Sequence, residues 1–153
     1  MTFFWRALGS FSLCPLGVTE MNHLHGYARV STDQQETSST VQEQRLRAFA
    51  MTSGLELAEV YVDEDVSGAK PMKMRPAGKR LWDAIQPGDT IAFTKVDRAF
   101  RSLVDAATTL EIWKNLGVHV VILDVGIDVA SPAGELFFSQ LVAFAQFERK
   151  LLG

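Results

Sequence analysis

Four arginines and a serine stand at or just beyond the ends of expected β-strands, where their spacing could do chemistry. Arg29 lies in the stretch GYARVST, two residues before Ser31. Arg75 follows a second expected strand, and VDRAFRS places Arg98 and Arg101 after a third. Because ligands bind at the carboxyl edge of a parallel sheet, we expect these side chains to converge. Planar guanidinium groups match phosphate oxygens and a serine hydroxyl can attack phosphorus, so the set predicts an anion site suited to phosphoryl transfer.

Each of these signals also has an ordinary structural explanation. A serine after a strand is more often a helix cap than a nucleophile. An Arg-x-x-Arg pair behind an aspartate is usually a solvated ion-pair face. The prediction of an anion site therefore depends on the order in which these motifs follow one another along the chain, and not on any one of them.

Other common kinds of site find no support in the residue types. The histidines, at positions 23, 25 and 119, fit no Ser-His-Asp arrangement. A single cysteine gives no zinc-site spacing, and no glycine-rich phosphate loop is present. We therefore expect neither a metal nor another cofactor.

The composition is that of one ordinary globular domain. The 153 residues carry 47% hydrophobic and 22% charged residues, which argues against disorder. The net charge is −3, yet the stretch from Ser67 to Arg101 holds eight Lys and Arg against three Asp. That local positive field suits a polyanion such as DNA better than the overall charge suggests. The single cysteine, Cys14, excludes an internal disulfide framework, and no stretch predicts a membrane span.

The first residues of the chain stand apart from the rest. MTFFWRALGSFSLCPLGVTE has one arginine, a short apolar run and no helical or strand period, and Met21 follows it. We expect residues 1–22 to be a disordered leader from a mis-set start or non-native sequence, with a targeting segment as the alternative. Residues 23–153 are expected to form the folded domain.

After Met21, strand and helix patterns alternate, which predicts an α/β domain with a mostly parallel central sheet flanked by helices. Glycines and prolines separate the periodic segments, and 63–76 is expected to be a long mobile loop. The expected strands are 24–30, 55–62, 90–94 and 118–123, and the expected helices are 39–52, 76–85, 102–115 and 132–152.

The last expected helix, PAGELFFSQLVAFAQFERKLL, is apolar on nearly every face. A helix that covers one sheet face needs only an apolar stripe. The surplus predicts either complete burial or a partner chain, and we expect an oligomer interface here.

The motifs occur together in one known family. They are YARVST at 27–32, the acid-x-x-Ser-Gly of 64–68, Arg-Pro at 75–76, DRxxRS at 97–102, PAGELFF at 132–138 and FER at 147–149. From about Gly26 to Leu152 the chain resembles the catalytic domain of serine site-specific recombinases of the resolvase/invertase type, enzymes of mobile DNA elements.

The resemblance implies a reaction and a set of roles. Ser31 would be the nucleophile that joins covalently to the 5′ phosphate of cleaved DNA, followed by strand exchange and religation without ATP or metal. Arg29, Arg98 and Arg101 would bind the scissile phosphate, and Arg75 would complete the site. The supporting or DNA-binding positions implied are Tyr27, Gln44, Glu64, Ser67, Asp97 and Arg149.

The resemblance also implies partners and a location. Family members act on DNA as dimers that pair into tetramers, with the last helix supplying much of the interface. The expected location is the bacterial cytoplasm, on the nucleoid. In the family that helix continues into a basic DNA-binding domain, so we expect this chain to be truncated before it.

The sequence departs from the usual family pattern at three points, and two other interpretations of its function remain. Ala99-Phe100 replaces a frequent Leu-Gly, the distance from Ser31 to Gln44 is long, and the chain stops at Gly153. One rival is a catalytically incompetent remnant that only dimerises or interferes with full-length relatives. The other is an α/β binding domain of flavodoxin or receiver type, although a receiver would need acids where Arg29 and Ser31 stand.

Overall fold

The computed structural model of the chain describes residues 22–31 and 38–153. The predicted leader, residues 1–22, therefore lies outside the described residues except for Asn22.

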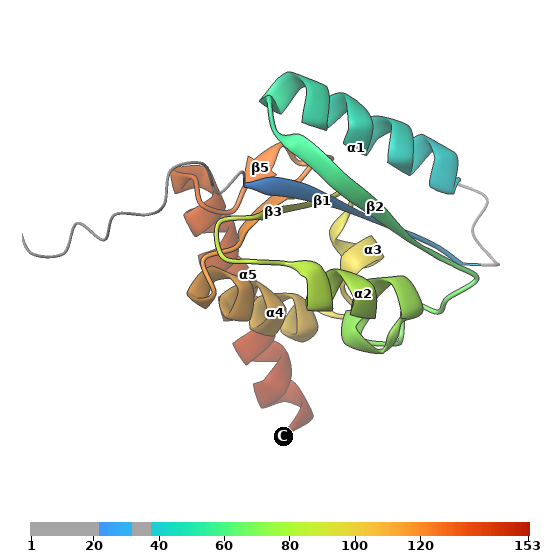
Figure 1. Ribbon diagram of the computed structural model, residues 1–153. Helices are drawn as coiled ribbons and strands as arrows, with labels where there is room; N and C mark the ends of the chain where they lie inside the picture. The colour runs from blue at the N-terminus through green and yellow to red at the C-terminus, as the bar shows by residue number, and fades with distance from the viewer. Residues whose placement is uncertain (1–21, 32–37) are drawn as a thin grey trace, which may run out of the picture.

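The described residues fold around one five-stranded sheet (Figure 1). The strands are β1 (His23–Val30), β2 (Glu56–Glu64), β3 (Thr90–Phe93), β4 (His119–Ile122) and β5 (Ile127–Asp128). Their order is β2-β1-β3-β4-β5, with every neighbouring pair parallel except β4 and β5, which are antiparallel. This confirms the predicted mostly parallel sheet. Two-residue β5 was not predicted, because so short a strand leaves no periodic pattern.

Helices cover both faces of the sheet, as Figure 1 shows for α1 on one side and for α2 and α4 on the other. Apolar side chains of both faces form two core clusters, one of them holding Leu24 and Leu46 and the other Tyr27 and Trp113. The helices are α1 (Ser39–Ser53), α2 (Pro76–Ala84), α3 (Val96–Ala99), α4 (Leu103–Asn115) and α5 (Pro132–Leu152), with a 3₁₀ turn, η1 (Met72–Met74).

Capping residues explain where the long helices begin. The hydroxyl oxygens of Ser38, Ser102 and Ser131 accept backbone N–H bonds at the starts of α1, α4 and α5. Gly54 ends α1 in the left-handed conformation, with φ +70°, which glycine adopts at little cost.

Glycine is also required where α5 begins. A Cβ on Gly134 would lie only 2.0 Å from the carbonyl oxygen of Asp128 and 2.5 Å from Cα of Val129. The absence of a side chain therefore lets the turn after β5 press against the first turn of α5, which explains the glycine in PAGELFF.

The expected 63–76 loop is more ordered than its composition suggests. Asp63 and Glu64 belong to β2, and η1 precedes α2. A Cβ on Gly78 would lie 2.3 Å from the carbonyl oxygen of Met72, so glycine allows η1 to fold onto α2. The expectation of one long loop over 63–76 was therefore wrong at its two ends, whereas residues 65–71 belong to no helix or strand.

At the amino edge of the sheet, Asp89 is buried among hydrogen-bond donors. Its carboxylate accepts the backbone N–H groups of His23 and Gln86 at 3.0 and 2.8 Å, and Nε2 of His25 lies 3.1 Å away. Burial alone would raise the pKa of Asp89, but the two N–H bonds and His25 outweigh it. The pKa of Asp89 is therefore held below its ordinary value.

This carboxylate predicts a loss of stability in acid. Because the folded-state pKa lies below that of the unfolded chain, about 3.9, the stabilisation is present above the unfolded value. It is lost as the pH falls through the folded-state pKa. At pH 7 we expect Asp89→Asn to lower the free energy of unfolding by about 1–3 kcal/mol and to flatten its dependence on pH below about 4.

Urea denaturation between pH 2.5 and 7 measures both effects, with Asp83→Asn as the control because Asp83 is an exposed acid on α2. An acid dependence in Asp89→Asn as steep as in the unchanged protein would contradict the account.

The predicted surplus of apolar residues on α5 is exposed in the single chain. Leu141 and Ala145 are buried, whereas Phe144 and Phe147 are 60% and 58% exposed. The C-terminal half of α5 projects beyond α4, as the red end of the ribbon in Figure 1 shows. Within the part of the chain that the structure describes, no helix is both long and apolar enough to cross a bilayer.

Candidate active site

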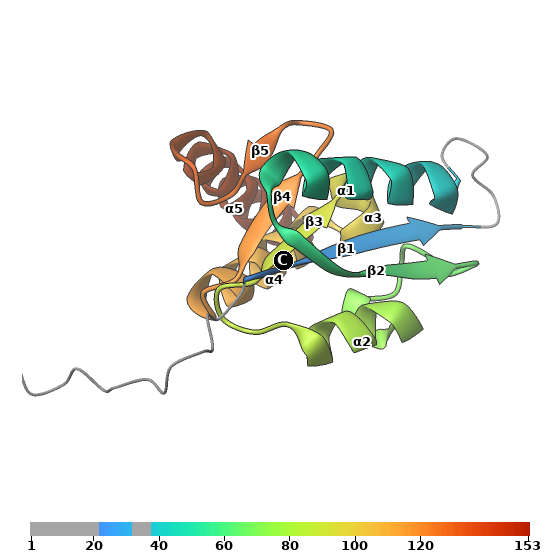
Figure 2. The ribbon, with the colours of Figure 1, turned by 45° about the horizontal axis from the view of Figure 1, so that its top comes forward.

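Three of the four predicted arginines, each following a different strand or near its end, are buried together at the carboxyl edge of the sheet. Arg29 near the end of β1 is 5% exposed, Arg75 before α2 is 0% exposed, and Arg98 in α3 is 3% exposed. Figure 2 shows the heads of β1 and β2 pointing to the same edge. Among residues 22–31 and 38–153, no ion pair involves any of the three guanidinium groups.

Arg75 is held by hydrogen bonds rather than by a carboxylate. Its Nη1 donates to the hydroxyl of Tyr27 at 2.9 Å and to the carbonyl of Arg98 at 2.8 Å. Its Nε donates to the carbonyl of Lys70 at 2.9 Å, and Nη2 reaches that of Gly68 at 3.4 Å. These bonds place the guanidinium between the end of β1, the segment after β2 and α3.

Arg29 lies on the same face of β1 as Tyr27, two residues away. Its Nη1 donates to the carbonyl of Val66 at 2.9 Å and its Nη2 to that of Asp97 at 3.2 Å. Its buried Nε has no hydrogen-bond partner among the described residues.

The positive charges around Arg29 act on its pKa. Burial lowers the pKa of Arg29, and the neighbouring charges of Arg75 and Arg98 lower it further. Like charges at one buried spot destabilise each other, so an anion placed among them would be bound strongly.

The backbone of Arg29 is satisfied by a glutamine that was not predicted. β3 pairs with β1 only as far as Tyr27. Beyond that point the buried side chain of Gln42 takes the place of a strand, because its amide donates to the carbonyl of Arg29 at 3.1 Å and accepts its N–H at 3.4 Å. Gln42 lies on the buried stripe of α1 with Leu46 and Ala50, a helical spacing that could have identified it.

Gln44, the glutamine that was predicted to support the site, is exposed on α1. It makes none of the contacts with Arg29 that Gln42 makes. A supporting role for Gln44 stays a prediction.

The remaining predicted positions lie around the cluster with side chains that are more exposed. Ser31 is half-buried directly after β1. Glu64 accepts a hydrogen bond from the hydroxyl of Ser39 at 3.1 Å, and the Ser67 hydroxyl accepts the N–H of Ala69 at 3.2 Å. Asp97 reaches Arg29 through its carbonyl, while its side chain is exposed.

Two predicted arginines are not part of the buried group. Arg101 is exposed, and its Nε lies 3.9 Å from a carboxylate oxygen of Asp105, which is the ordinary ion-pair explanation for an Arg-x-x-Arg motif. Arg149 is exposed in the last turn of α5.

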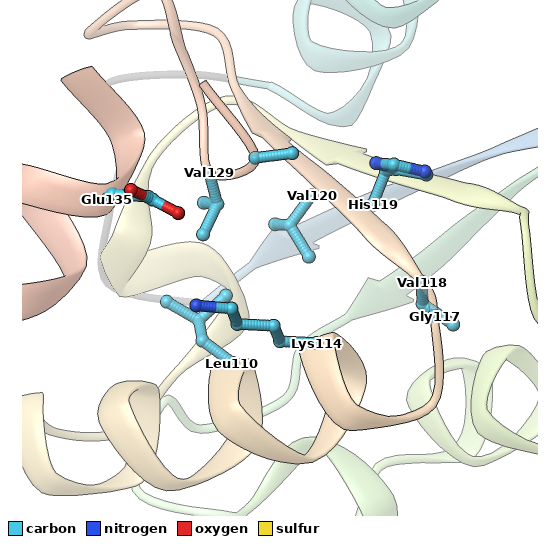
Figure 3. A pocket seen from close by; sticks show the side chains of 9 residues that line it. Leu110, Lys114, Gly117, Val118, His119, Val120, Val129 and Glu135 are labelled. Atoms are coloured by element: carbon cyan, nitrogen blue, oxygen red, sulfur yellow. The ribbon is translucent and has the colours of Figure 1, made fainter. Parts of the chain in front are cut away.

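A hollow of about 210 Å³ lies elsewhere, at the amino end of β4 (Figure 3). Val120 and Val129 form apolar parts of its wall, and Lys114 from α4 and Glu135 from α5 lie at its polar side. His119 opens β4 beside it. Since the arginine cluster lies at the carboxyl edge, this hollow is a separate feature.

Comparisons with known proteins place the chain in one family. The family model described as "Resolvase, N terminal domain" matches residues 24–153. The chain is 33% identical over 134 residues to the transposon Tn2501 resolvase of Escherichia coli, covering 86% of this chain and 66% of that protein. It is 35% identical over 129 residues to the transposon Tn552 DNA-invertase BinR of Staphylococcus aureus, covering 83% and 62%. The chain thus spans somewhat less than two thirds of the length of these relatives.

Solved structures show the same architecture. The N-terminal catalytic domain of TP901-1 integrase matches with a TM-score of 0.73 and 32% identity, over 85% of this chain and 98% of that one. A resolvase family site-specific recombinase from Streptococcus pneumoniae matches with a TM-score of 0.67 and 27% identity, over 86% and 90%. From the match across residues 24–153 and the shared fold, we conclude that the chain belongs to the resolvase family and carries its N-terminal domain.

Proposed function

We propose that this protein is a serine recombinase that cleaves and rejoins DNA through a covalent 5′-phosphoserine at Ser31. The hydroxyl oxygen of Ser31 would attack the scissile phosphorus, and the bond from phosphorus to the 3′ oxygen would break. Ser31 loses its hydroxyl proton and the leaving 3′ oxygen gains one, so the step is balanced, and the reverse attack by a 3′ hydroxyl on the phosphoserine restores both the DNA and the serine. The names of the relatives, a transposon resolvase and a DNA-invertase, support this class of reaction.

The observation that carries the proposal is the buried group of Arg29, Arg75 and Arg98. Three buried guanidinium groups without an ion pair among the described residues are costly unless an anion joins them. A phosphate diester is such an anion, and Nε of Arg29, which has no hydrogen-bond partner within 22–31 and 38–153, offers it a donor. Charge that develops on the phosphate oxygens during attack would be stabilised there.

The proposal requires the site to open when DNA binds. Arg75 is fully buried, and the carbonyls of Gly68 and Lys70 accept its hydrogen bonds. A Cβ on Gly68 would lie 2.9 Å from Nη2 of Arg29, so this segment also covers Arg29. DNA phosphate would therefore displace the Val66–Lys70 segment and take over the donors that its carbonyls now occupy.

The direct test is incubation of the protein with duplex DNA of randomised sequence that is labelled at its 3′ ends. The 3′ label stays on the strand that carries the 5′ phosphate, so attack by Ser31 would yield a labelled protein band that survives SDS. Sequencing the attached strands would give the target site. No labelled band at any protein concentration would refute cleavage by this chain and favour the remnant that only assembles with relatives.

We further propose that α5 pairs this chain with a second copy. Phe144 and Phe147 line a hollow on α5 with Gln140 and Ala143, and both rings are more than half exposed. Exposed aromatic rings of this size on one helix are typical of an interface. Pairing of such dimers into a tetramer would bring two cleaved DNA sites together for strand exchange.

A charge placed in this surface is expected to separate the copies. Phe144→Glu should shift the mass in sedimentation equilibrium from twice the 16.9 kDa of one chain to that of the monomer, and raise the dissociation constant at least about 10²-fold. Met51→Glu is the matched control, since Met51 is a still more exposed apolar residue on α1. A dimer of unchanged stability in Phe144→Glu would show that α5 is not the interface.

A further inference from the structure

Asp63, near the end of β2, is a buried carboxylate at the same edge of the sheet as the arginine cluster. It is 2% exposed and pairs in register with Arg29 on the neighbouring strand. Its oxygens accept three hydrogen bonds, from the hydroxyl of Tyr27 at 2.8 Å and from the backbone N–H groups of Ala77 and Gly78 at 2.8 and 3.0 Å. A buried charge with this many donors is fully compensated.

Asp63 determines which way the hydroxyl of Tyr27 points. A carboxylate only accepts hydrogen bonds, so Tyr27 must give it the hydroxyl proton. A lone pair on the hydroxyl oxygen then faces Arg75, whose Nη1 donates to it at 2.9 Å. The three groups form a directed chain from the guanidinium through the hydroxyl to the carboxylate.

The ionisation of Tyr27 fits this chain. Burial raises the pKa of Tyr27, and the charge of Asp63 raises it further, while Arg75 lowers it. The result is a pKa far above the ordinary value, so the phenol keeps its proton and can serve Asp63 as a donor at neutral pH.

The same carboxylate also holds the backbone next to Arg75. Ala77 and Gly78 lie in the first turn of α2, which begins at Pro76 directly after Arg75. The N-terminus of a helix favours a negative charge, and Asp63 supplies it from a different strand. Asp63 therefore restrains Arg75 at both ends, at the backbone through α2 and at the guanidinium through Tyr27.

We propose that Asp63 is a positioning residue that holds Arg75 ready to bind the scissile phosphate. The inference rests on the proposed function for its effect on DNA cleavage. The restraint on Arg75 is itself a property of the folded chain and can be measured without DNA.

The experiment compares Asp63→Asn with Asp83→Asn, an equal change of charge at an exposed acid on α2. The Asn side chain offers an NH₂ group where Asp63 has a second acceptor oxygen, so at least one of the three donors loses its acceptor. We expect the rate of adduct formation per folded molecule to fall about 10²-fold, while the affinity for DNA changes less than threefold. Asp83→Asn should leave both unchanged.

A second measurement follows Arg75 without activity. Its Nε–H donates to the carbonyl of Lys70 inside the protein, so its ¹⁵N-edited NMR resonance is protected from solvent exchange. We expect this resonance to shift and exchange faster in Asp63→Asn, and in Tyr27→Phe if Asp63→Asn does not fold. If the chemical shift and the exchange rate of this resonance are unchanged in both variants, the positioning role is overturned.

A double variant separates positioning from general stability. If Asp63 acts on Arg75 largely through Tyr27, then Asp63→Asn should lower the adduct rate much less in the Tyr27→Phe background than in the unchanged protein. If the two substitutions lower the adduct rate independently of each other, the hydrogen-bond path from Arg75 through Tyr27 to Asp63 is contradicted. An unchanged protein that forms no adduct, together with a shifted Arg75 resonance in Asp63→Asn, would refute the proposed function and leave the positioning intact.

Discussion

Ser31→Ala is expected to abolish the covalent attachment of this protein to DNA, with a loss of at least about 10³-fold. The substitution removes the only atom that could form the phosphoester at this position, while the arginine cluster keeps its contacts. DNA affinity should therefore change little. The band that survives SDS with 3′-labelled DNA measures the adduct, and gel retardation measures the affinity.

The control for this variant is Ser139→Ala. The hydroxyl of Ser139 donates to the carbonyl of Glu135 one turn earlier in α5, and the residue is exposed. Its loss should leave the adduct at the level of the unchanged protein. Normal adduct formation by Ser31→Ala would overturn the assignment of the nucleophile.

Arg75→Lys is the second change with a large expected effect, although it keeps the positive charge. One ammonium group cannot reach the carbonyls of Lys70, Gly68 and Arg98 and the hydroxyl of Tyr27 at once, because the guanidinium spans them as a planar fork. We expect adduct formation to fall about 10²–10³-fold. The free energy of unfolding should fall by about 1–3 kcal/mol, since a buried acceptor loses its partner.

Arg80→Lys is the matched control, because Arg80 is exposed on α2 and pairs with Glu59 at the surface. Urea denaturation gives the stability and the labelled DNA gives the rate. If Arg75→Lys cleaves as well as Arg80→Lys, the buried guanidinium has no part in catalysis.

The parallel sheet and the long helices could be predicted from the sequence because each has a local signal. The prediction of the last helix from Pro132 to Leu152 is confirmed to the residue, with its proline and serine at the start. The placement of Arg29, Arg75 and Arg98 together followed from the rule that parallel strands share a carboxyl edge. Arg101, which the same rule placed with them, lies at the surface, so the rule predicts the edge of the sheet but not which side chains are buried there.

What could not be predicted depends on contacts between distant residues. Gln42 and Gln44 stand two positions apart in one helix, and only the packing of α1 onto β1 decides that Gln42 reaches Arg29. Asp63 looked like the start of a loop, because its partners Tyr27 and Ala77 lie far away in the sequence. The antiparallel β5 also distinguishes this fold from a flavodoxin-like sheet of the same strand order, and its two residues carry no pattern.

The most direct test of the central claim is to locate the attached nucleotide. Trypsin would release Val30–Arg45 from the adduct, a peptide that holds Ser31, Thr32 and further hydroxyl residues. After nuclease digestion, fragmentation of this peptide in the mass spectrometer shows which hydroxyl residue carries the remaining nucleotide. The account predicts the mass on Ser31, joined through a 5′ phosphate. Its presence on Thr32 or on any other residue would contradict the account.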